Sequence, residues 1–249
     1  MARKIVLNSG KGGVGKTTVC ANLGMALANR SQRVVAVDLD VGLNNLDVTL
    51  GLDNRVVFDL VDVLENRCRV TQALLKVEVA PTFFVMPSCH QSVRMFTPDN
   101  VKRIINRLDE QFDYVLIDCP AGMDQGFMRA VNCADEGLVV CTPHLSSVRD
   151  ADKVVRHLAT KENFPLAVVV NRVRGDLVAQ GKMLSPMEVF SLLGQRPLGI
   201  IGEDDEVNCF GQSANVAFTI LADNLHFGTQ KLMDVVSQHK NFWRRLFNI

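Results

Sequence analysis

The chain has 249 residues, of which 47% are hydrophobic and 22% charged, and its formal net charge is zero. This length fits one compact domain with a substantial core, and the charge balance argues against a strongly basic surface that coats nucleic acid. The cysteines form no C-x-x-C pair, so we expect reduced, mostly buried thiols of a cytosolic protein. We expect neither a signal peptide nor a transmembrane helix, because a strand pattern begins at once and no apolar run approaches ~18 residues.

A glycine-rich loop lies between the first predicted strand and the first predicted helix. Residues 10–17 read G-K-G-G-V-G-K-T, a full match to G-x-x-x-x-G-K-[ST]. Residues 4–8 before it have the apolar pattern of a buried strand, and residues 19–29 after it have apolar side chains at helical spacing. Glycines allow backbone N–H groups to turn toward a phosphate chain, and the helix adds its positive end. The pattern predicts a loop that binds the phosphate chain of a nucleotide.

Two side chains of this loop have distinct expected roles. Lys16 is expected to lie against the β- and γ-phosphates, and the Thr17 hydroxyl to bind the Mg²⁺ that bridges them. The alternative is a glycine-rich turn without a ligand, although strand, spacing and helix all agree with the motif. The residues that we expect to contact the nucleotide are Gly10, Lys11, Gly12, Gly13, Val14, Gly15, Lys16, Thr17 and Thr18.

Carboxylates follow two further predicted strands. Residues 33–38 are rich in β-branched side chains and end in Asp38, and Asp40 comes two residues later. Residues 112–118 form an apolar strand that ends in Asp118, as in the Walker B arrangement, where the carboxylate holds the water shell of Mg²⁺. Ligands of parallel α/β sheets bind beyond the carboxyl ends of strands, so these residues should face the phosphate loop. The alternative for Asp38 and Asp40 is an ordinary surface turn.

The remaining elements alternate between strands and helices. We expect helices at residues 58–64, 71–75, 98–111 and 225–236, and strands at residues 82–87, 136–142, 166–172 and 197–201. Ser146 or Ser147 is expected to cap a further helix, with acidic residues in its first turn. The fold class is therefore α/β, with three layers, a mostly parallel central sheet and helices on both faces.

The C-terminal residues differ in character from the rest. At about 100° per residue, apolar side chains after residue 238 fall on one arc and basic or polar ones on the other. Such a helix suits a membrane interface, although it could instead pack on its own domain. We therefore divide the chain into an ATPase domain, 1–237, and an amphipathic membrane-targeting helix, 238–249. The residues expected to meet an anionic membrane are Lys240, Phe242, Trp243, Arg244, Arg245, Leu246 and Phe247.

The loop sequence K-G-G-V-G-K-T-T resembles that of the deviant Walker A family of P-loop ATPases, and later segments resemble the family's division-site-selection branch. These segments are V-D-L-D-V-G-L-N-N-L-D, D-C-P-A-G, S-S-V-R-D-A-D and the terminal F-W-R-R-L-F. The resemblance implies that Lys11 reaches across an ATP-bound homodimer to the partner's phosphates, and that Asp152 lies at the same interface. It also implies that Asp40 serves the attacking water, whereas Asp38 belongs to the Mg²⁺ shell.

The resemblance assigns two further nucleotide contacts. Gly122 would offer its N–H to the γ-phosphate as part of a switch, and Asn171, whose amide can donate and accept in one plane, would contact adenine. Asn171 could otherwise be a turn residue at a strand end. The chain departs from the family at Asn8, where Thr is frequent, and at Gly202, where Pro is usual. The second departure leaves the packing of adenine open.

The resemblance implies a slow, partner-stimulated ATPase that is cytoplasmic and peripheral on the inner face of the cell membrane. Such proteins help to place the division septum by recruiting a division inhibitor, and they have a stimulating or topological partner. The alternatives are a regulator of flagellar number and a ParA-type DNA-partition ATPase. A partition protein would need clustered Lys and Arg, and no comparable run occurs here. We therefore expect no specific nucleic-acid partner.

Overall fold

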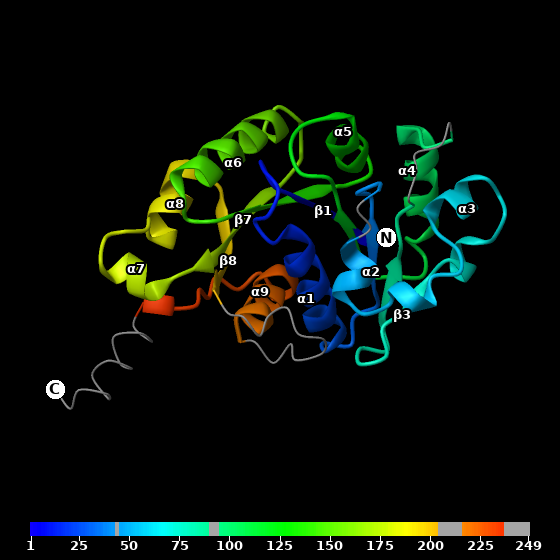
Figure 1. Cartoon of the computed structure of the whole chain (residues 1–249), viewed down its shortest axis with the longest axis horizontal. Helices are drawn as coiled ribbons and strands as arrows, with labels where there is room; N and C mark the ends of the chain where they lie inside the picture. The colour runs from blue at the N-terminus through cyan, green and yellow to red at the C-terminus, as the bar shows by residue number, and fades with distance from the viewer. Residues whose placement is uncertain (43–44, 90–94, 204–215, 237–249) are drawn as a thin grey trace.

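An eight-stranded sheet runs through the middle of the molecule. The computed structural model describes residues 1–42, 45–89, 95–203 and 216–236. The strand order is β3-β4-β2-β5-β1-β6-β7-β8 (Figure 1). Neighbouring strands are parallel, except that β3 and β4 are antiparallel. The strands are β1 (Arg3–Asn8), β2 (Val34–Asp38), β3 (Leu75–Lys76), β4 (Phe83–Met86), β5 (Tyr114–Asp118), β6 (Glu136–Cys141), β7 (Leu166–Val173) and β8 (Arg196–Gly202).

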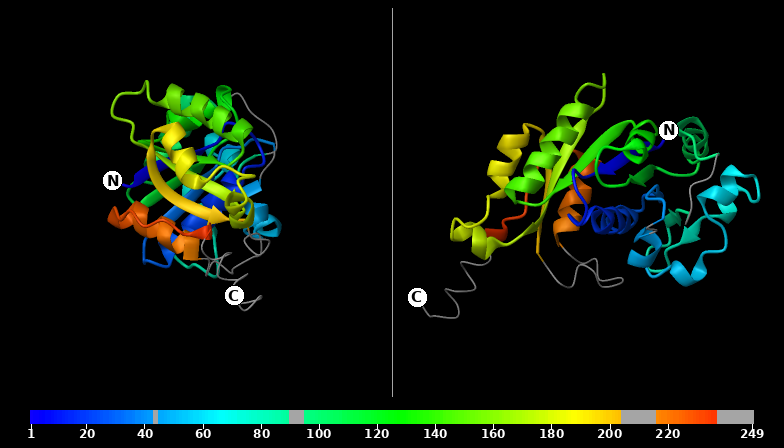
Figure 2. Two further views of the ribbon diagram at one scale, coloured as in Figure 1. Left: turned by 90° about the vertical axis from the view of Figure 1, so that its left-hand side faces the viewer. Right: turned by 45° about the horizontal axis from the view of Figure 1, so that its top comes forward.

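Helices cover both faces of this sheet (Figures 1 and 2). They are α1 (Lys16–Ala28), α2 (Asn45–Thr49), α3 (Leu60–Leu64), α4 (Pro98–Arg107), α5 (Gln125–Val131), α6 (Leu145–Leu158), α7 (Gly175–Ala179), α8 (Pro186–Leu193) and α9 (Val216–Phe227). One core lies under α1, α2 and α9, and a second lies under α3, α4, α5, α6 and α8. The predicted three-layer architecture with a mostly parallel sheet is confirmed.

The helix α1 is buried on nearly all sides. Eleven of its thirteen residues are buried, because α1 packs on the sheet while α9 and α2 contact its other faces. A methyl group on Gly24 would overlap the ring of Phe83 on β4. The absence of a side chain at Gly24 therefore brings α1 close to the sheet, and the helix that follows the phosphate loop is fixed in place.

Two predicted helices differ from those observed. The helix predicted at residues 225–236 begins earlier, at Val216, and ends at Phe227. Gly228 has a φ of 69° there, and the Asn224 side chain accepts from the N–H of Lys231, at 3.0 Å, and from Thr229 Oγ1. These contacts turn the chain away from the helix axis.

The second difference lies at the edge of the sheet, where a helix was predicted at residues 71–75. The structure has a short 3₁₀ turn at Val70–Gln72 and then the strand β3. Without β3, the strand β4 would have an unpaired side, and β3 covers it by pairing Leu75 with Val85. Pairing with a neighbouring strand has therefore outweighed local helix preference.

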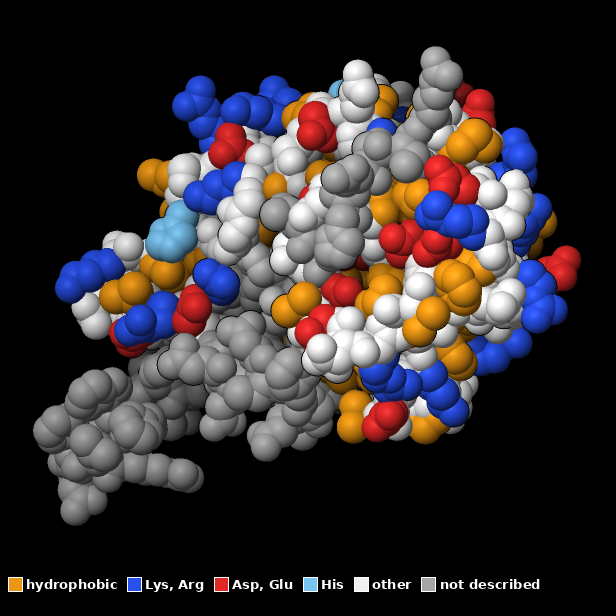
Figure 3. Space-filling model, turned by 45° about the vertical axis from the view of Figure 1, so that its right-hand side comes forward, with side chains coloured by type: hydrophobic (Ala, Val, Ile, Leu, Met, Phe, Trp, Pro, Cys, Tyr) orange, Lys and Arg blue, Asp and Glu red, His pale blue; other side chains and the backbone are white. Residues whose placement is uncertain are grey.

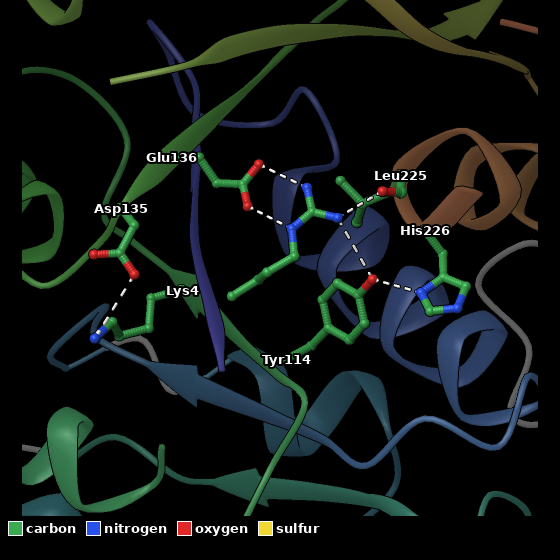
Figure 4. A network of polar contacts seen from close by, with 7 residues as sticks. Lys4, Tyr114, Asp135, Glu136, Leu225 and His226 are labelled. Atoms are coloured by element: carbon green, nitrogen blue, oxygen red, sulfur yellow. Dashed lines mark hydrogen bonds and ion pairs between the residues drawn. The ribbon is translucent and has the colours of Figure 1, made fainter. Parts of the chain in front are cut away.

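The amino-terminal edge of the sheet carries a network of polar side chains (Figure 4). The Arg3 guanidinium donates to both carboxylate oxygens of Glu136, at 2.8 and 2.9 Å, and to the Leu225 carbonyl at 2.6 Å. The Tyr114 hydroxyl lies 2.8 Å from His226 Nδ1. Since Leu225 and His226 lie in the last turn of α9, the network ties this helix to β1, β5 and β6.

Replacing Arg3 by alanine should destabilise the protein by about 1–2 kcal/mol, because Glu136 and the Leu225 carbonyl would lose charge-assisted donors. Urea unfolding followed by circular dichroism measures this change. The matched control is Arg55→Ala, since the Arg55–Glu78 pair is exposed and should contribute little. Equal stability losses in the two variants would contradict the assigned role of the Arg3 network.

The surface carries charges of both signs. Acidic and basic side chains are interspersed with apolar ones on the face shown in Figure 3. Within the described ranges, no helix combines the length and apolar character needed to cross a membrane. Cys20, Cys119, Cys133 and Cys141 are buried free thiols.

Candidate functional site

The predicted site residues come together at the carboxyl ends of four strands. The phosphate loop follows β1, Asp38 ends β2, Asp118 ends β5, and Asn171 lies near the end of β7. In the register of the sheet Asp38 lies beside Asp118, and Asp118 lies beside Leu7, just before the loop. Parallel pairing places these ends on one edge. The predicted convergence of loop and carboxylates is therefore present in the fold.

Glycine shapes the loop where it enters α1. Gly13 and Gly15 have φ angles of 79° and 88°, a region that favours glycine, and Gly15 is the N-cap of the helix. The helix begins at Lys16, three residues before the predicted start at residue 19. A methyl group on Gly15 would overlap the Asn171 side chain, whose Nδ2 donates to the Val14 carbonyl at 2.8 Å. Asn171 thus supports the loop, and its role toward adenine stays a prediction.

Replacing Gly10 by alanine should lower the thermal midpoint by several degrees, because the added methyl group would overlap the backbone of Asp150 on α6. The loop or the helix would have to shift, as in other overpacked sites. The matched control is Gly12→Ala, since a methyl group there has no neighbour within 4 Å. Thermal unfolding without nucleotide checks the pair, and equal midpoints would contradict the close approach of the loop to α6.

Lys16 forms a buried ion pair at the foot of the loop. Its Nζ lies 2.5 Å from Asp118 Oδ1, and the two side chains are 7% and 1% exposed. Burial, the largest single effect, works to lower the pKa of Lys16, but the charge and hydrogen bond of Asp118 together with smaller contributions from neighbouring thiols outweigh it, and the net shift is upward. Lys16 therefore stays cationic, and in the absence of phosphate it is neutralised by Asp118.

Burial disfavours the charged forms of the two other carboxylates, Asp38 and Asp40. Burial, followed by the charge of Asp118, raises the pKa of Asp38 to about 7. Backbone N–H groups of Asp40 and Leu46 donate to Asp38 at 2.8 and 3.2 Å, which partly stabilises its charge. Asp40 is partly buried, and burial raises its pKa as well. An added cation would lower the free energy of this cluster of carboxylates.

The donor set fits a magnesium ion held partly through water. Asp118 Oδ2 is buried and has no hydrogen-bond partner among the described residues, so one carboxylate oxygen is left for a hydrated ion. Asp38 lies beside it on the neighbouring strand, and Thr17 is at the start of α1. Hydroxyl and carboxylate oxygens are the ligands that Mg²⁺ prefers. The residues predicted for the metal are therefore compatible with it.

The entrance lysine contacts its own chain. Lys11 Nζ donates to Ser146 Oγ at 3.3 Å, in an exposed contact, and sequence reasoning did not identify Ser146 as its partner. Asp152 forms an ion pair with Arg156 at 2.8 Å, one turn along α6. The proposed roles of Lys11 and Asp152 between subunits stay predictions.

The start of α6 differs from its prediction. The helix begins at Leu145, its N-cap is His144 without a side-chain cap, and its first turn has no acidic residue. Ser147 lies inside the helix, where its Oγ accepts from the Thr142 N–H at 3.0 Å. The predicted serine cap and acidic first turn are therefore wrong, because the helix starts earlier and Ser147 bonds back to the end of β6.

The segment after β5 is hydrogen-bonded to Ser9, which follows β1 and leads into the phosphate loop. The Gly122 N–H donates to the Ser9 carbonyl at 3.0 Å, whereas the sequence predicts that it serves the γ-phosphate. Gly122 has a φ of 93°, which explains the need for glycine. Ser9 was not predicted as a site residue, since a backbone contact between distant segments leaves no pattern in the sequence.

Some predicted features lie at or beyond the limits of the described residues. The membrane-targeting residues, 238–249, and the domain boundary at 237 lie outside them. Gly202 ends β8, and a methyl group there would lie 3.7 Å from Val235, in ordinary contact. Its role in adenine packing stays open.

Comparisons with known proteins agree on one family. A family model described as an AAA domain matches residues 2–163. The septum site-determining protein MinD of Bacillus subtilis (strain 168) is 47% identical over 210 residues, which cover 83% of this chain and 78% of that protein.

Two solved structures have the same fold. The MinC:MinD cell division protein complex of Aquifex aeolicus includes a chain with a TM-score of 0.84 and 34% identity, covering 94% of this chain and 99% of that one. The septum site-determining protein MinD complexed with Mg-ADP from Pyrococcus horikoshii OT3 has a TM-score of 0.80 and 29% identity, covering 91% and 96%. These relatives favour the division-site branch over the flagellar and DNA-partition alternatives.

Proposed function

This chain belongs to the MinD family of septum site-determining ATPases, and we propose on that basis that it binds ATP with Mg²⁺, dimerises, attaches to the membrane and releases after hydrolysis. The observation that carries the proposal is the buried Lys16–Asp118 pair at the foot of a complete phosphate loop. A phosphate chain would offer Lys16 a second anionic partner, which would leave Asp118 free to hold the water shell of Mg²⁺. The pair thus stabilises the site between turnovers.

Different residues of the chain are assigned to phosphate binding, to metal binding and to the attacking water. The loop N–H groups and Lys16 bind the phosphates, and Thr17, Asp38 and Asp118 would hold Mg²⁺, which neutralises charge on the transferring phosphoryl group. Asp40 is assigned to orienting the attacking water. The raised pKa of Asp40 makes it a better proton acceptor than an exposed aspartate. With no partner at the site, we expect slow turnover.

Dimerisation would complete the site through Lys11. The contact of Lys11 with Ser146 is long and exposed, so a phosphate of the ATP bound to the partner subunit could replace Ser146 at little cost. Two ATP molecules would then lie between the subunits, and hydrolysis would weaken the dimer. Asp152 is proposed to face the partner's lysine after release from Arg156.

The carboxyl-terminal residues, 238–249, are proposed to couple dimerisation to the membrane. Each basic residue contributes ~1 kcal/mol near an anionic leaflet, and each buried apolar side chain at most ~1.5–3 kcal/mol, reduced by ordering. One copy therefore binds weakly. Two copies on one dimer gain about 10²- to 10⁴-fold in avidity. The nucleotide state would thus decide whether the protein is cytoplasmic or peripheral on the inner face of the membrane.

A division inhibitor is the proposed cargo of the membrane-bound dimer. The solved MinC:MinD complex of Aquifex aeolicus supports this assignment, because its chain and this one share the same fold over nearly their whole lengths. A separate stimulating or topological partner would accelerate hydrolysis and so set the lifetime of the bound state. No specific nucleic acid is needed for this cycle.

Liposome co-sedimentation tests the proposal. The protein should pellet with vesicles of anionic lipid in Mg-ATP and stay in the supernatant in ADP. Deletion of residues 242–249 should remove pelleting while ATP binding survives, because the ATP site lies in the preceding domain. Lys11→Ala should retain ATP binding but lose dimerisation and pelleting.

Three outcomes would contradict the proposal. Equal pelleting in ATP and ADP would reject attachment gated by nucleotide, and retention on DNA without lipid binding would favour a partition protein. A monomer in light scattering, measured at high concentration with a non-hydrolysable ATP analogue, would reject the dimer and with it the pairing of two tails.

A further inference from the structure

The turn that follows β5 is fastened to the end of β1 by two contacts. We call residues 119–122 the switch turn. At its far end the Gly122 N–H donates to the Ser9 carbonyl at 3.0 Å. At its near end the Cys119 thiol donates to Asn8 Oδ1 at 2.7 Å. Both acceptors belong to the two residues that lead into the phosphate loop. We call the contact that Asn8 and Ser9 make with Cys119 and Gly122 the seam.

This seam is closed to solvent. Asn8 and Cys119 are 0% exposed and Ser9 is 1% exposed. The thiol of Cys119 is fully enclosed, so its hydrogen bond to Asn8 Oδ1 does not compete with solvent water. The same thiol also lies 3.2 Å from the Pro120 carbonyl. Cys119 therefore acts in this seam as a buried hydrogen-bond donor.

Asn8 uses only part of its hydrogen-bonding capacity. Its Oδ1 accepts from Cys119, but its buried Nδ2 has no partner among the described residues, and neither has the buried Ser9 Oγ beside it. Buried donors without partners are unfavourable. They are suited to a segment whose contacts change during function. The seam thus combines two specific bonds with unused polar atoms.

The other side of the switch turn is also fixed. A methyl group on Gly126 in α5 would crowd the Pro120 ring at 2.7 Å. Asp124 caps α5 by accepting from the Gly126 and Phe127 N–H groups at 2.9 and 3.1 Å. The helix α5 therefore fixes one side of the switch turn. A small shift of the turn can exchange hydrogen bonds only on its other side, where it contacts Asn8 and Ser9.

We propose that Asn8 and Cys119 are positioning residues that hold the switch turn in a resting state, in which the Gly122 N–H is bound to Ser9 and withheld from phosphate. This inference rests on the proposed ATPase function. An N–H group has one hydrogen, so Gly122 cannot serve the Ser9 carbonyl and a γ-phosphate equally well. Occupation of the γ-phosphate position would then require the turn to leave Ser9, and the Cys119–Asn8 contact opposes that movement.

The pair should therefore act differently on two nucleotides. ADP lacks the γ-phosphate and leaves the resting contacts intact, whereas ATP has to break them. A contact that exists in just one of two states shifts the equilibrium between them by the free energy of that contact. A single neutral hydrogen bond corresponds to about a fivefold change in an equilibrium constant. A role limited to stabilising the fold would change both affinities alike.

The test compares Cys119→Ala with Cys119→Ser and with the matched control Cys141→Ala, which removes another fully buried thiol, at the end of β6. The affinities for ADP and for a non-hydrolysable ATP analogue are measured by calorimetry with Mg²⁺. Cys119→Ala should raise the preference for the ATP analogue about fivefold. Cys119→Ser should restore or exceed the wild-type preference for the resting state, because a hydroxyl is a stronger donor. Cys141→Ala should leave the ratio unchanged.

Hydrogen exchange gives a readout without nucleotide. In the resting protein, the peptide that covers the switch turn should exchange faster in Cys119→Ala and in Asn8→Ala than in wild type, and the double variant should add little. Equal shifts in both nucleotide affinities, or unchanged exchange of this peptide, would overturn the inference. Wild-type protein that binds no nucleotide would instead refute the proposed ATPase function, and the exchange result would still decide whether the pair fixes the turn.

Discussion

Replacing Lys16 by methionine is expected to abolish ATP hydrolysis, with a loss of at least about 100-fold, and to destabilise the nucleotide-free fold by ~3–5 kcal/mol. Activity falls because the transferring phosphate loses its cation. Stability falls because Asp118, 1% exposed, is left as an unpaired buried charge beside Asp38. Phosphate release and urea unfolding measure the two losses on the same preparation.

A second substitution separates these two effects. Adding Asp118→Asn to Lys16→Met removes the unpaired charge, so much of the stability should return while activity stays absent. The control on the surface is Lys153→Ala, whose partner Asp150 lies on the same helix in an exposed pair and whose loss should change stability by less than ~0.5 kcal/mol. A double variant that is no more stable than Lys16→Met would contradict the assigned pairing.

The nucleotide-free protein is expected to lose stability as the pH rises from about 4 toward 7, through Asp38. Burial first, and the charge of Asp118 second, raise the pKa of Asp38 from 3.8 to about 7. An acid with a raised pKa holds its proton more tightly in the folded chain than in the unfolded one. Its contribution to stability is therefore largest below the unfolded pKa and disappears as the pH passes the folded pKa.

The comparison of wild type with Asp38→Asn isolates this effect. Between about pH 4 and pH 7, the unfolding free energy of wild type should fall relative to the variant by up to ~1.4 kcal/mol per pH unit. The slope is decisive, because asparagine also changes the hydrogen bonds to Asp40 and Leu46 and so shifts the absolute stability. Parallel curves from urea unfolding at several pH values would show that Asp38 titrates normally.

The composition of the site could be predicted from the sequence for a geometric reason. In a parallel sheet the carboxyl ends of strands meet at one edge, so a glycine-rich loop after one strand and aspartates after two others had to converge. The rule places Asp38 and Asp118 on the same side of the sheet, and the pairing of β2 with β5 then brings them side by side. The α/β class followed in the same way from the alternation of apolar strands with helical patterns.

Contacts between distant segments could not be predicted. The partners Asn8 and Cys119 are 111 residues apart, and their contact depends on β1 lying next to β5, which periodicity does not specify. The contact of Lys11 with Ser146 likewise depends on the packing of α6 near the loop. The start of α8 does leave a pattern in the sequence, since Ser185 and Glu188 form a capping box and Pro186 is the first residue of the helix.

The burial of α1 has a consequence for measurements of motion. Because both of its sides are packed and Gly24 lies against Phe83, this helix cannot shift without opening a core, and we expect it to keep its position in the proposed nucleotide cycle. Its carboxyl-terminal cap, Asn29, is exposed. If the proposed dimer forms, a spin label at Asn29 in each subunit should therefore measure the distance between the two subunits, with little contribution from rearrangement within either one.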